Sequence, residues 1–290
     1  MRVLLSSNPY RDRGLRVALE ARRILNNAGA ETALCLPFAP RKGDRLDLPR
    51  QVKLGSLEEE LPSADLLICF GGDGTILHAA RDATLHNIPI LGVNMGSVGF
   101  MAELERGELS LLTLLAAGEY RTEERMMLSV RVLRGEKVLS EDLALNDAVI
   151  SKGSMARVAE MEVRADGVLV TNLMGDGVIV STPTGSTAYS LSAGGPIIDP
   201  SLESIIMTPI CPHSLASRSI VFNSDKILIV RPTMPDADTQ LCAIVDGTPV
   251  DHMEGIEYVT VEKSEYVSRF LCFKDRSFYQ TLNQKMKLRG

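Results

Sequence analysis

The sequence contains no tryptophan, and aromatic residues of all kinds make up only 4% of its 290 residues. Proteins that bind single-stranded nucleic acid commonly stack the bases on aromatic side chains. The chain also lacks a run of five or more basic residues, and its net charge is -6. Both features argue against nucleic acid as a partner, because a nucleic-acid surface is normally basic. An acidic chain can still bind anionic nucleotides through backbone amides and a bound metal.

Paired cysteines and long apolar runs are missing as well. The five cysteines form no C-x-x-C pair, and their number is odd. This usage is typical of free thiols in a reducing cytoplasm rather than of a disulfide framework or a zinc site. No run approaches the ~20 apolar residues that a membrane-spanning helix needs, and the apolar stretch at the N-terminus is too short for a signal peptide. We therefore expect a cytoplasmic protein with no membrane partner.

The first third of the chain alternates strand-like and helix-like segments. Apolar runs predict strands at residues 2–7, 31–36, 65–70 and 88–93. Residues 13–28 have helical spacing of their apolar positions, and Gly29 follows as a C-terminal cap. The run at 65–70 does not alternate, as expected for a strand buried on both faces of a parallel sheet. The pattern predicts an α/β N-terminal domain with a doubly wound parallel sheet.

The pattern changes after Gly118. From about Arg121 onward, short and often alternating segments are separated by Gly, Asp and Asn turns, which predicts an all-β-rich C-terminal domain. The tail becomes helical again, with Phe278, Leu282 and Met286 four residues apart. We expect this tail to pack back on the first domain. The predicted division is an α/β domain at 1–119 with 276–290 packed on it, and a β-rich domain at 120–275.

A glycine-rich loop, Gly71-Gly72-Asp73-Gly74-Thr75, follows the buried strand at 65–70. Its glycines permit positive φ and leave no Cβ in the way, so that backbone N–H groups can approach phosphate oxygens. A helix predicted to begin near Thr75 would point its positive end at the same place. The loop matches neither G-x-x-x-x-G-K-[ST] nor G-x-G-x-x-G, so it is neither a Walker A loop nor a Rossmann fingerprint.

Asp73 is the unusual residue of this loop, because a carboxylate beside bound phosphates is electrostatically costly. It could accept a proton from a hydroxyl nucleophile or help to hold magnesium. The structural alternative is that Asp73 caps the following helix through its side chain, although capping needs one glycine rather than three. His78, three residues after Thr75, either faces the same phosphate pocket or is an ordinary surface histidine.

Two later segments are rich in polar groups. Asn146 and Asp147 precede an apolar run, where they could bind ribose hydroxyls or simply form a turn. Residues 176–196 bring many hydroxyls together without any charge between Asp176 and Asp199. Such a loop suits a neutral, hydroxyl-rich ligand edge such as a ribose or a nucleobase, although Ser/Thr loops are often only solvated.

Together these motifs resemble those of bacterial NAD kinases. The order and spacing match from about Asp65 to Pro196, through Gly71–Thr75, Asn146-Asp147 and the T-P-T-G-S-T-A-Y-S stretch at 182–190. The G-G-D-G-T motif alone is shared with diacylglycerol and sphingosine kinases and, loosely, with phosphofructokinases. The long Thr-Gly-Ser-Thr-Ala-Tyr stretch is far more specific to NAD kinases.

The resemblance implies phosphoryl transfer from ATP, with Mg²⁺ or another divalent metal, to the adenosine ribose 2′-hydroxyl of NAD. It implies that Asp73 is the general base and that Asn146 and Asp147 bind the adenosine part. Asp176 matches an acidic position that contacts the nicotinamide half or a neighbouring subunit's ligand. The remaining positions that match nucleotide-binding ones are Gly72, Gly74, His78, Arg157, Thr187, Ala188, Tyr189, Ser190, Leu191 and Ser192. It further implies a homodimer or homotetramer, and no residue is assigned as a metal ligand.

The sequence departs from the NAD kinase pattern at one place, and two alternative functions remain open. After Asp246-Gly247 the family often carries a ligand-contacting glutamine, whereas this chain has Thr248-Pro249, so no site residue is assigned there. A lipid kinase that shares the G-G-D-G-T loop would need an apolar acyl pocket or a membrane-facing surface, and the sequence offers no basic amphipathic helix for one. A non-catalytic nucleotide sensor is the other alternative, against which the presence of Asp73 argues.

Overall fold

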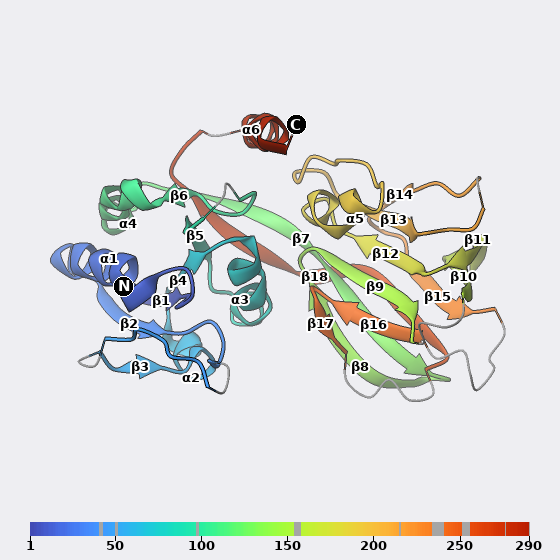
Figure 1. Cartoon of the computed structure of the whole chain (residues 1–290), viewed down its shortest axis with the longest axis horizontal. Helices are drawn as coiled ribbons and strands as arrows, with labels where there is room; N and C mark the ends of the chain where they lie inside the picture. Colours follow the sequence, from blue (N-terminus) through green and yellow to red (C-terminus); the bar gives the residue numbers. More distant parts are fainter. Residues whose placement is uncertain are drawn as a thin grey trace. The chain divides into compact units, whose positions relative to one another are not determined.

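The computed structural model describes residues 1–40, 43–49, 52–96, 99–153, 158–214, 216–233, 241–250, 256–275 and 277–289. The chain forms two compact units (Figure 1). The first unit comprises Met1–Glu124 and Ser268–Gly290, and the second comprises Arg125–Val267. The strands β7 (Arg121–Arg134) and β18 (Tyr258–Cys272) contribute residues to both.

The first unit alternates strands with helices, as its hydrophobic pattern predicts. Its strands are β1 (Arg2–Ser7), β2 (Glu31–Cys35), β3 (Leu54–Gly55), β4 (Leu66–Gly71), β5 (Ile90–Asn94) and β6 (Leu104–Glu105). Its α-helices are α1 (Arg16–Asn27), α2 (Leu57–Glu60), α3 (Asp73–Leu85), α4 (Thr113–Ala117) and α6 (Phe278–Arg289). Short 3-10 helices lie at η1 (Arg13–Leu15), η2 (Leu61–Ser63) and η3 (Arg106–Leu112).

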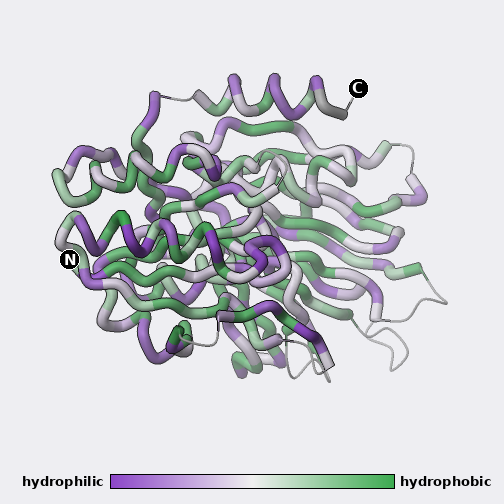
Figure 2. The backbone as a smooth tube through the Cα atoms, turned by 60° about the vertical axis from the view of Figure 1, so that its left-hand side comes forward, coloured by the Kyte–Doolittle hydropathy of each residue, from purple (hydrophilic) through white to green (hydrophobic). Residues whose placement is uncertain are grey.

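The sheet of the first unit is parallel, with the order β3-β2-β1-β4-β5. Every residue of β4 and β5 is buried, which fits the continuous apolar runs of central strands covered on both faces. Figure 2 shows the hydropathy of each residue along the backbone, with hydrophobic residues in green. Because parallel strands share one direction, the loops after β1, β2 and β4 emerge at the same edge of the sheet, where ligands bind in open α/β sheets.

The second unit is built mainly of antiparallel strands. Besides parts of β7 and β18, they are β8 (Lys137–Ala144), β9 (Asp147–Lys152), β10 (Ala159–Ala165), β11 (Val168–Gly175), β12 (Gly177–Ser181), β13 (Ser204–Ile210), β14 (Ile220–Asn223), β15 (Leu228–Pro232), β16 (Leu241–Val245) and β17 (Thr248–Pro249). Two short helices, η4 (Gly185–Thr187) and α5 (Tyr189–Ser192), follow β12.

Six of these strands form one sheet in the order β14-β13-β12-β9-β16-β17. A second group of strands, β11-β10-β15-β18, pairs antiparallel, and β7 pairs with β18 and β8. Buried side chains from both groups, including Ile150, Val178, Met161 and Val230, form one hydrophobic cluster. The inward-facing residues of the two groups therefore make the core of this unit.

The structure confirms the predicted fold class, a parallel α/β unit at the N-terminus followed by a β-rich unit. The helix expected at 13–28 begins as η1 and continues as α1, and Gly29 has the positive φ of 85° expected after a helix end. The helix expected near Thr75 begins two residues earlier, at Asp73. In the described part of the chain no helix is long and apolar enough to cross a membrane.

Candidate functional site

The glycine-rich loop lies directly between β4 and α3, with Gly72 at the N-cap of the helix. Gly71, Gly72 and Gly74 all lack a positive φ, so the loop does not use the left-handed conformations that glycine permits. Gly71 is required for another reason: a Cβ there would lie 2.2 Å from Oγ1 of Thr75. A Cβ on Gly72 or Gly74 would meet no atom of the described residues within 4 Å. The open side of the loop therefore leaves room for a ligand at the positive end of α3.

The Asp73 carboxylate points away from its own helix and does not cap it. Its Oδ2 accepts a hydrogen bond from the backbone N–H of Phe100 (2.9 Å), and its Oδ1 accepts one from Met101 (3.1 Å). Gly99 permits this approach, since a Cβ at that position would lie 2.2 Å from Oδ1. The capping interpretation is therefore wrong, and the carboxylate is held in one orientation by a loop 27 to 28 residues away. A lysine of the C-terminal helix, Lys285, approaches Oδ2 of this carboxylate at 3.5 Å.

The loops after β1 and β2 lie next to the start of α3. The Asn8 side chain donates to Oγ1 of Thr75 (3.1 Å). The Tyr10 ring stacks on Phe38, with the ring centroids 6.0 Å apart, and Phe38 meets the edge of His78 at 5.9 Å. These contacts connect the glycine-rich loop to an aromatic cluster on the same edge of the sheet.

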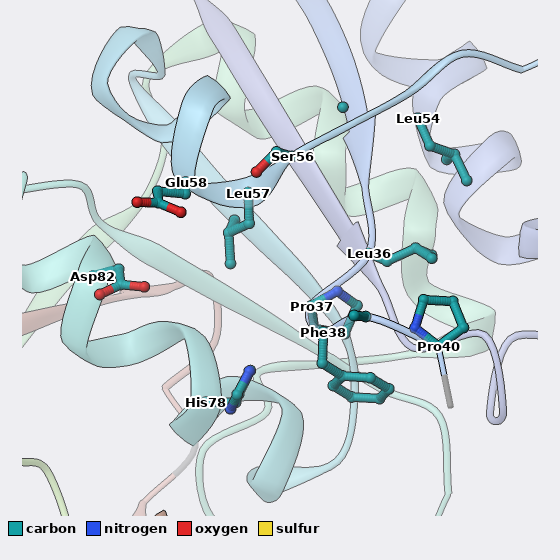
Figure 3. Close-up of a pocket in the computed structure, with 12 residues that line it drawn as sticks. Leu36, Pro37, Phe38, Pro40, Leu54, Ser56, Leu57, Glu58, His78 and Asp82 are labelled. Atoms are coloured by element: carbon teal, nitrogen blue, oxygen red, sulfur yellow. The ribbon is translucent and has the colours of Figure 1, made fainter. Parts of the chain in front are cut away.

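This aromatic cluster borders a pocket of about 400 Å³, shown in Figure 3. Phe38 and His78 lie on one side of the pocket, and Ser56, Leu57 and Glu58 come from the segment that starts α2. The pocket is lined by Leu36, Pro37, Phe38, Ala39, Pro40, Leu54, Gly55, Ser56, Leu57, Glu58, His78 and Asp82. Its walls are mostly apolar, with a few acceptor groups, as in sites that bind flat heterocycles.

In the second unit, Asn146 and Asp147 lie at the start of β9 and are buried, with 8% and 6% exposed. The carboxylate of Asp246, in the turn after β16, accepts the backbone N–H groups of Leu145 (2.7 Å), Asn146 (2.9 Å) and Asp147 (3.0 Å). Burial, together with the facing Asp246, raises the pKa of Asp147 to about 7. Burial also raises the pKa of Asp246, to about 6. Two acids thus share one buried site.

The Asn146 side chain has an unsatisfied acceptor. Its Oδ1 is buried and has no hydrogen-bond partner among the described residues, a state that is costly unless a ligand supplies a donor. The loop after β12 packs directly on Asn146, because a Cβ on Gly185 would lie 2.0 Å from the Asn146 carbonyl oxygen. Thr182 anchors this loop by accepting the Gly185 N–H (3.0 Å) and donating to the Leu145 carbonyl (2.5 Å).

Most hydroxyls of the loop at 182–192 bond to the protein itself. Ser186 donates to the Pro183 carbonyl (2.6 Å), Thr187 to the Thr184 carbonyl (3.3 Å), and Ser190 is hydrogen-bonded to Thr208 (2.9 Å). Tyr189 is 46% exposed, and Ser192 is also exposed. Ala188 precedes α5, and Leu191 lies within it. The hydroxyls expected to face a ligand therefore largely fix the shape of the loop.

The remaining predicted positions lie elsewhere. Asp176 sits between β11 and β12, where its carboxylate pairs with Lys152 at 2.7 Å. The hydrogen bond from Lys152 holds the pKa of Asp176 below its ordinary value. Arg157 lies outside the described residues. Thr248 and Pro249, which replace the expected glutamine, form the exposed strand β17.

No group of three or more His, Cys, Asp or Glu side chains suited to a metal ion occurs in the described ranges. Magnesium normally keeps several waters and binds through one or two carboxylates together with substrate phosphates. Asp73, beside the positive end of α3, is compatible with a magnesium ion that arrives with a phosphate chain. The described residues do not offer a magnesium site in which protein side chains supply all the ligands.

The sequence patterns missed the residues that hold these acids in place. Gly99, Phe100, Met101 and Lys285 surround Asp73, and Asp246 organises the start of β9. The glycine spacing of residues 92–99 was a signal for a tight loop, and Asp246-Gly247 for a turn. Neither pattern predicts which residues Asp73 and Asp246 contact, because these contacts join distant parts of the chain.

Comparison with known families identifies two matching domains. Residues 18–120 match the ATP-NAD kinase N-terminal domain, and residues 145–272 match the ATP-NAD kinase C-terminal domain. The chain is 43% identical over 224 residues to an NAD kinase from Natranaerobius thermophilus, a match that covers 77% of this chain and 78% of the relative.

Two solved structures have a similar fold. An NAD kinase from Archaeoglobus fulgidus in complex with ATP matches with a TM-score of 0.74 and 26% identity, covering 99% of both chains. Yeast NADH kinase complexed with NADH matches with a TM-score of 0.82 and 22% identity, covering 99% of this chain and 87% of the other. At that identity the second match supports the fold alone.

Proposed function

The chain belongs to the ATP-NAD kinase family, and from this premise we propose that it phosphorylates the 2′-hydroxyl of the adenosine ribose of NAD with Asp73 as general base. ATP is the donor, and NADP and ADP are the products. The observation that carries the proposal is the Asp73 carboxylate, held by two backbone N–H groups beside the open N-terminus of α3. A fixed acceptor next to a phosphate site is what hydroxyl-to-phosphoryl transfer requires.

The reaction balances as a single displacement. The ribose 2′-oxygen forms a bond to the γ-phosphorus while the bond between that phosphorus and the β,γ-bridging oxygen breaks, and ADP leaves with the electron pair. The 2′-hydroxyl proton passes to Asp73, which must lie within about 3 Å of that oxygen. The backbone N–H groups at the start of α3 stabilise the phosphate chain. Gly72 and Gly74 allow that chain to approach, since none of the described residues occupies the space that a Cβ would take there.

Asn146 and Asp147 bind the adenosine part of NAD in this proposal. The unpaired Oδ1 of Asn146 offers an acceptor to a ligand donor, and an ionised Asp147 accepts hydrogen bonds from ribose hydroxyls. Thr187, Ala188, Tyr189, Ser190, Leu191 and Ser192 shape the loop around the adenine. Asp176, and Arg157 outside the described ranges, remain proposed contacts on the basis of the family resemblance.

The pocket beside His78 takes the adenine of the donor ATP. Its apolar walls suit a flat heterocycle, and Ser56, Glu58 and Asp82 can accept hydrogen bonds from an exocyclic amine. His78 follows Asp73 by five residues on α3, a rise of about 7.5 Å along the helix. A triphosphate can therefore extend from the pocket to the glycine-rich loop.

A divalent ion such as Mg²⁺, when bound, offsets negative charge on the donor phosphates. Phosphate oxygens and water would hold it, and Asp73 is the protein carboxylate that could join them. The β-rich second unit mediates assembly into a homodimer or homotetramer, as the family resemblance suggests. Size-exclusion chromatography with light scattering tests the proposed oligomeric state, and a monomer at micromolar concentration would contradict it.

The decisive experiment combines the purified protein with NAD, ATP and Mg²⁺ and measures NADP with an NADP-specific dehydrogenase. We expect NADP to form only when donor and metal are both present. Tight NAD binding by calorimetry without any NADP formation would instead identify a nucleotide sensor. His78→Ala tests the donor pocket: we expect a higher KM for ATP and an unchanged KM for NAD, whereas an unchanged KM for ATP would exclude His78 from it.

A further inference from the structure

The C-terminal helix places a lysine against the Asp73 carboxylate. Nζ of Lys285 lies 3.5 Å from Oδ2 of Asp73, and the Lys285 side chain is only 19% exposed. The same ammonium lies over the ring of Phe100, 3.9 Å from its centroid. Phe100 also donates its backbone N–H to Asp73 (2.9 Å). Phe100 therefore orients the Asp73 carboxylate through its backbone and contacts the Lys285 ammonium through its ring.

The helix α6, which carries Lys285, also packs against Phe100. The Phe278 ring at the start of α6 packs against Phe100, with the centroids 6.0 Å apart. Phe278 and Lys285 are seven residues apart, so both project from one face of α6. This helix lies outside both segments that match the family domains. The position of the ammonium therefore follows from the structure of this chain rather than from the matched motifs.

We propose that Lys285 is a catalytic residue that binds the γ-phosphoryl group of the donor while Asp73 accepts the acceptor's proton. The inference rests on the proposed phosphotransferase function. Charge-assisted hydrogen bonds between an ammonium and a carboxylate are usually about 2.7–2.9 Å long, so the 3.5 Å contact is a loose one. An ammonium has three donors, and among the described residues the Nζ of Lys285 donates a hydrogen bond to Asp73 alone. Donors therefore remain for a second anionic partner.

When the donor binds, its γ-phosphoryl group brings a second negative charge next to Asp73 and Lys285. The attacking oxygen lies within about 3 Å of Asp73, so the γ-phosphoryl oxygens must come close to the same carboxylate. Two negative groups at that separation repel each other strongly. A cation beside both of them compensates this repulsion and stabilises the charge on the transferring group. Lys285 forms no covalent bond in this step, and the 2′-hydroxyl proton still goes to Asp73.

The test compares Lys285→Met with Lys285→Arg and with Lys287→Met, an exposed position on the same helix. We expect Lys285→Met to lower kcat by about 10- to 100-fold, with the NAD dissociation constant within twofold of that of the unmodified protein. Lys285→Arg should recover most of kcat, because the charge is restored, and Lys287→Met should leave activity unchanged. A purely structural role for Lys285 would instead lower the melting midpoint and weaken NAD binding along with kcat.

A binding measurement separates this inference from the proposed function. In an Asp73→Asn background, adding Lys285→Met should weaken MgATP binding by roughly tenfold, since a phosphate contact is lost. Unchanged MgATP affinity, or a kcat that rises in Lys285→Met, would overturn the inference and indicate that Lys285 masks Asp73. Full activity of Asp73→Asn alone would instead overturn the general-base assignment.

Discussion

Two aspartates, one in each unit, have opposite environments. Asp73 in the first unit is partly exposed, accepts two backbone N–H groups and lies near the cationic Lys285. Asp147 in the second unit is 6% exposed and faces another acid, Asp246. The first carboxylate is stabilised by donors and a positive charge. The second is destabilised by burial and by like charge, which raise its pKa to about 7.

This difference suits two different tasks. A base that must take a proton repeatedly needs a fixed orientation and access to the substrate, and both are available to Asp73. The buried Asp147 lies beside the unpaired Oδ1 of Asn146, an arrangement that suits a recognition site in which a ligand supplies the missing donor. We propose that Asp73 serves catalysis in the first unit and that Asp147 serves binding in the second, and the following predictions test that division.

The largest expected effect comes from Asp73→Asn, which preserves the shape of the side chain and removes the base. We expect turnover to fall by about 10²- to 10⁴-fold and NAD binding to stay nearly unchanged. Steady-state NADP formation and calorimetric NAD titration measure the two quantities. Near-normal turnover would show that Asp73 is not the base.

Gly99→Ala should have the next largest effect. A Cβ at Gly99 would lie 2.2 Å from Oδ1 of Asp73, so the carboxylate must shift. We expect a loss in kcat of about 10- to 100-fold, because small displacements of a reacting group are costly. Gly107→Ala is the matched control, since a Cβ there meets nothing within 4 Å. Equal kcat for both variants would contradict a fixed orientation of Asp73.

Asp147→Asn tests the second carboxylate through the pH dependence of stability. The pKa of Asp147 is about 7 in the folded state, against an ordinary value of 3.8. Its stabilising contribution is therefore complete below 3.8 and is lost as the pH rises through 7. Asp147→Asn should thus be more stable than the unmodified protein at pH 8, by on the order of 1–3 kcal/mol, and the gain should shrink at pH 5.

Melting followed by circular dichroism suits this measurement, because the chain has no tryptophan to report unfolding. Asp275→Asn is the control, since that side chain is 97% exposed. NAD binding by Asp147→Asn should also weaken if the carboxylate contacts the ribose. A stability difference that does not change between pH 5 and pH 8 would argue against the raised pKa.

The smallest expected effect concerns the Asp176–Lys152 ion pair. Its side chains are 44% and 26% exposed, and pairs near the surface contribute less than about 1 kcal/mol. Lys152→Met should therefore change the melting midpoint only slightly. A large rise in the KM for NAD with unchanged stability would show that this pair contacts the ligand instead.

Much of the first unit could be predicted from periodicity. Continuous apolar runs identified β1, β2, β4 and β5, because strands buried on both faces exclude polar residues. The two-residue strands β3 and β6 and the helical segment η3–α4 were not predicted, since short elements carry little periodic signal. In the second unit, residues 176–196 were predicted to form a binding loop because of their many hydroxyls. Several of those hydroxyls instead hold the loop together.

The sequence by itself determined the strand–loop–helix context of the glycine-rich loop, its single carboxylate and the chemical family to which these motifs belong. It determined them because hydrophobic periodicity and motif spacing are local properties of the chain. Only the tertiary structure decided how each acid is held. Asp73 depends on residues 27, 28 and 212 positions away, and Asp246 binds backbone N–H groups 99 to 101 positions away. Such contacts form only when the sheets bring distant segments together, so no local pattern encodes them.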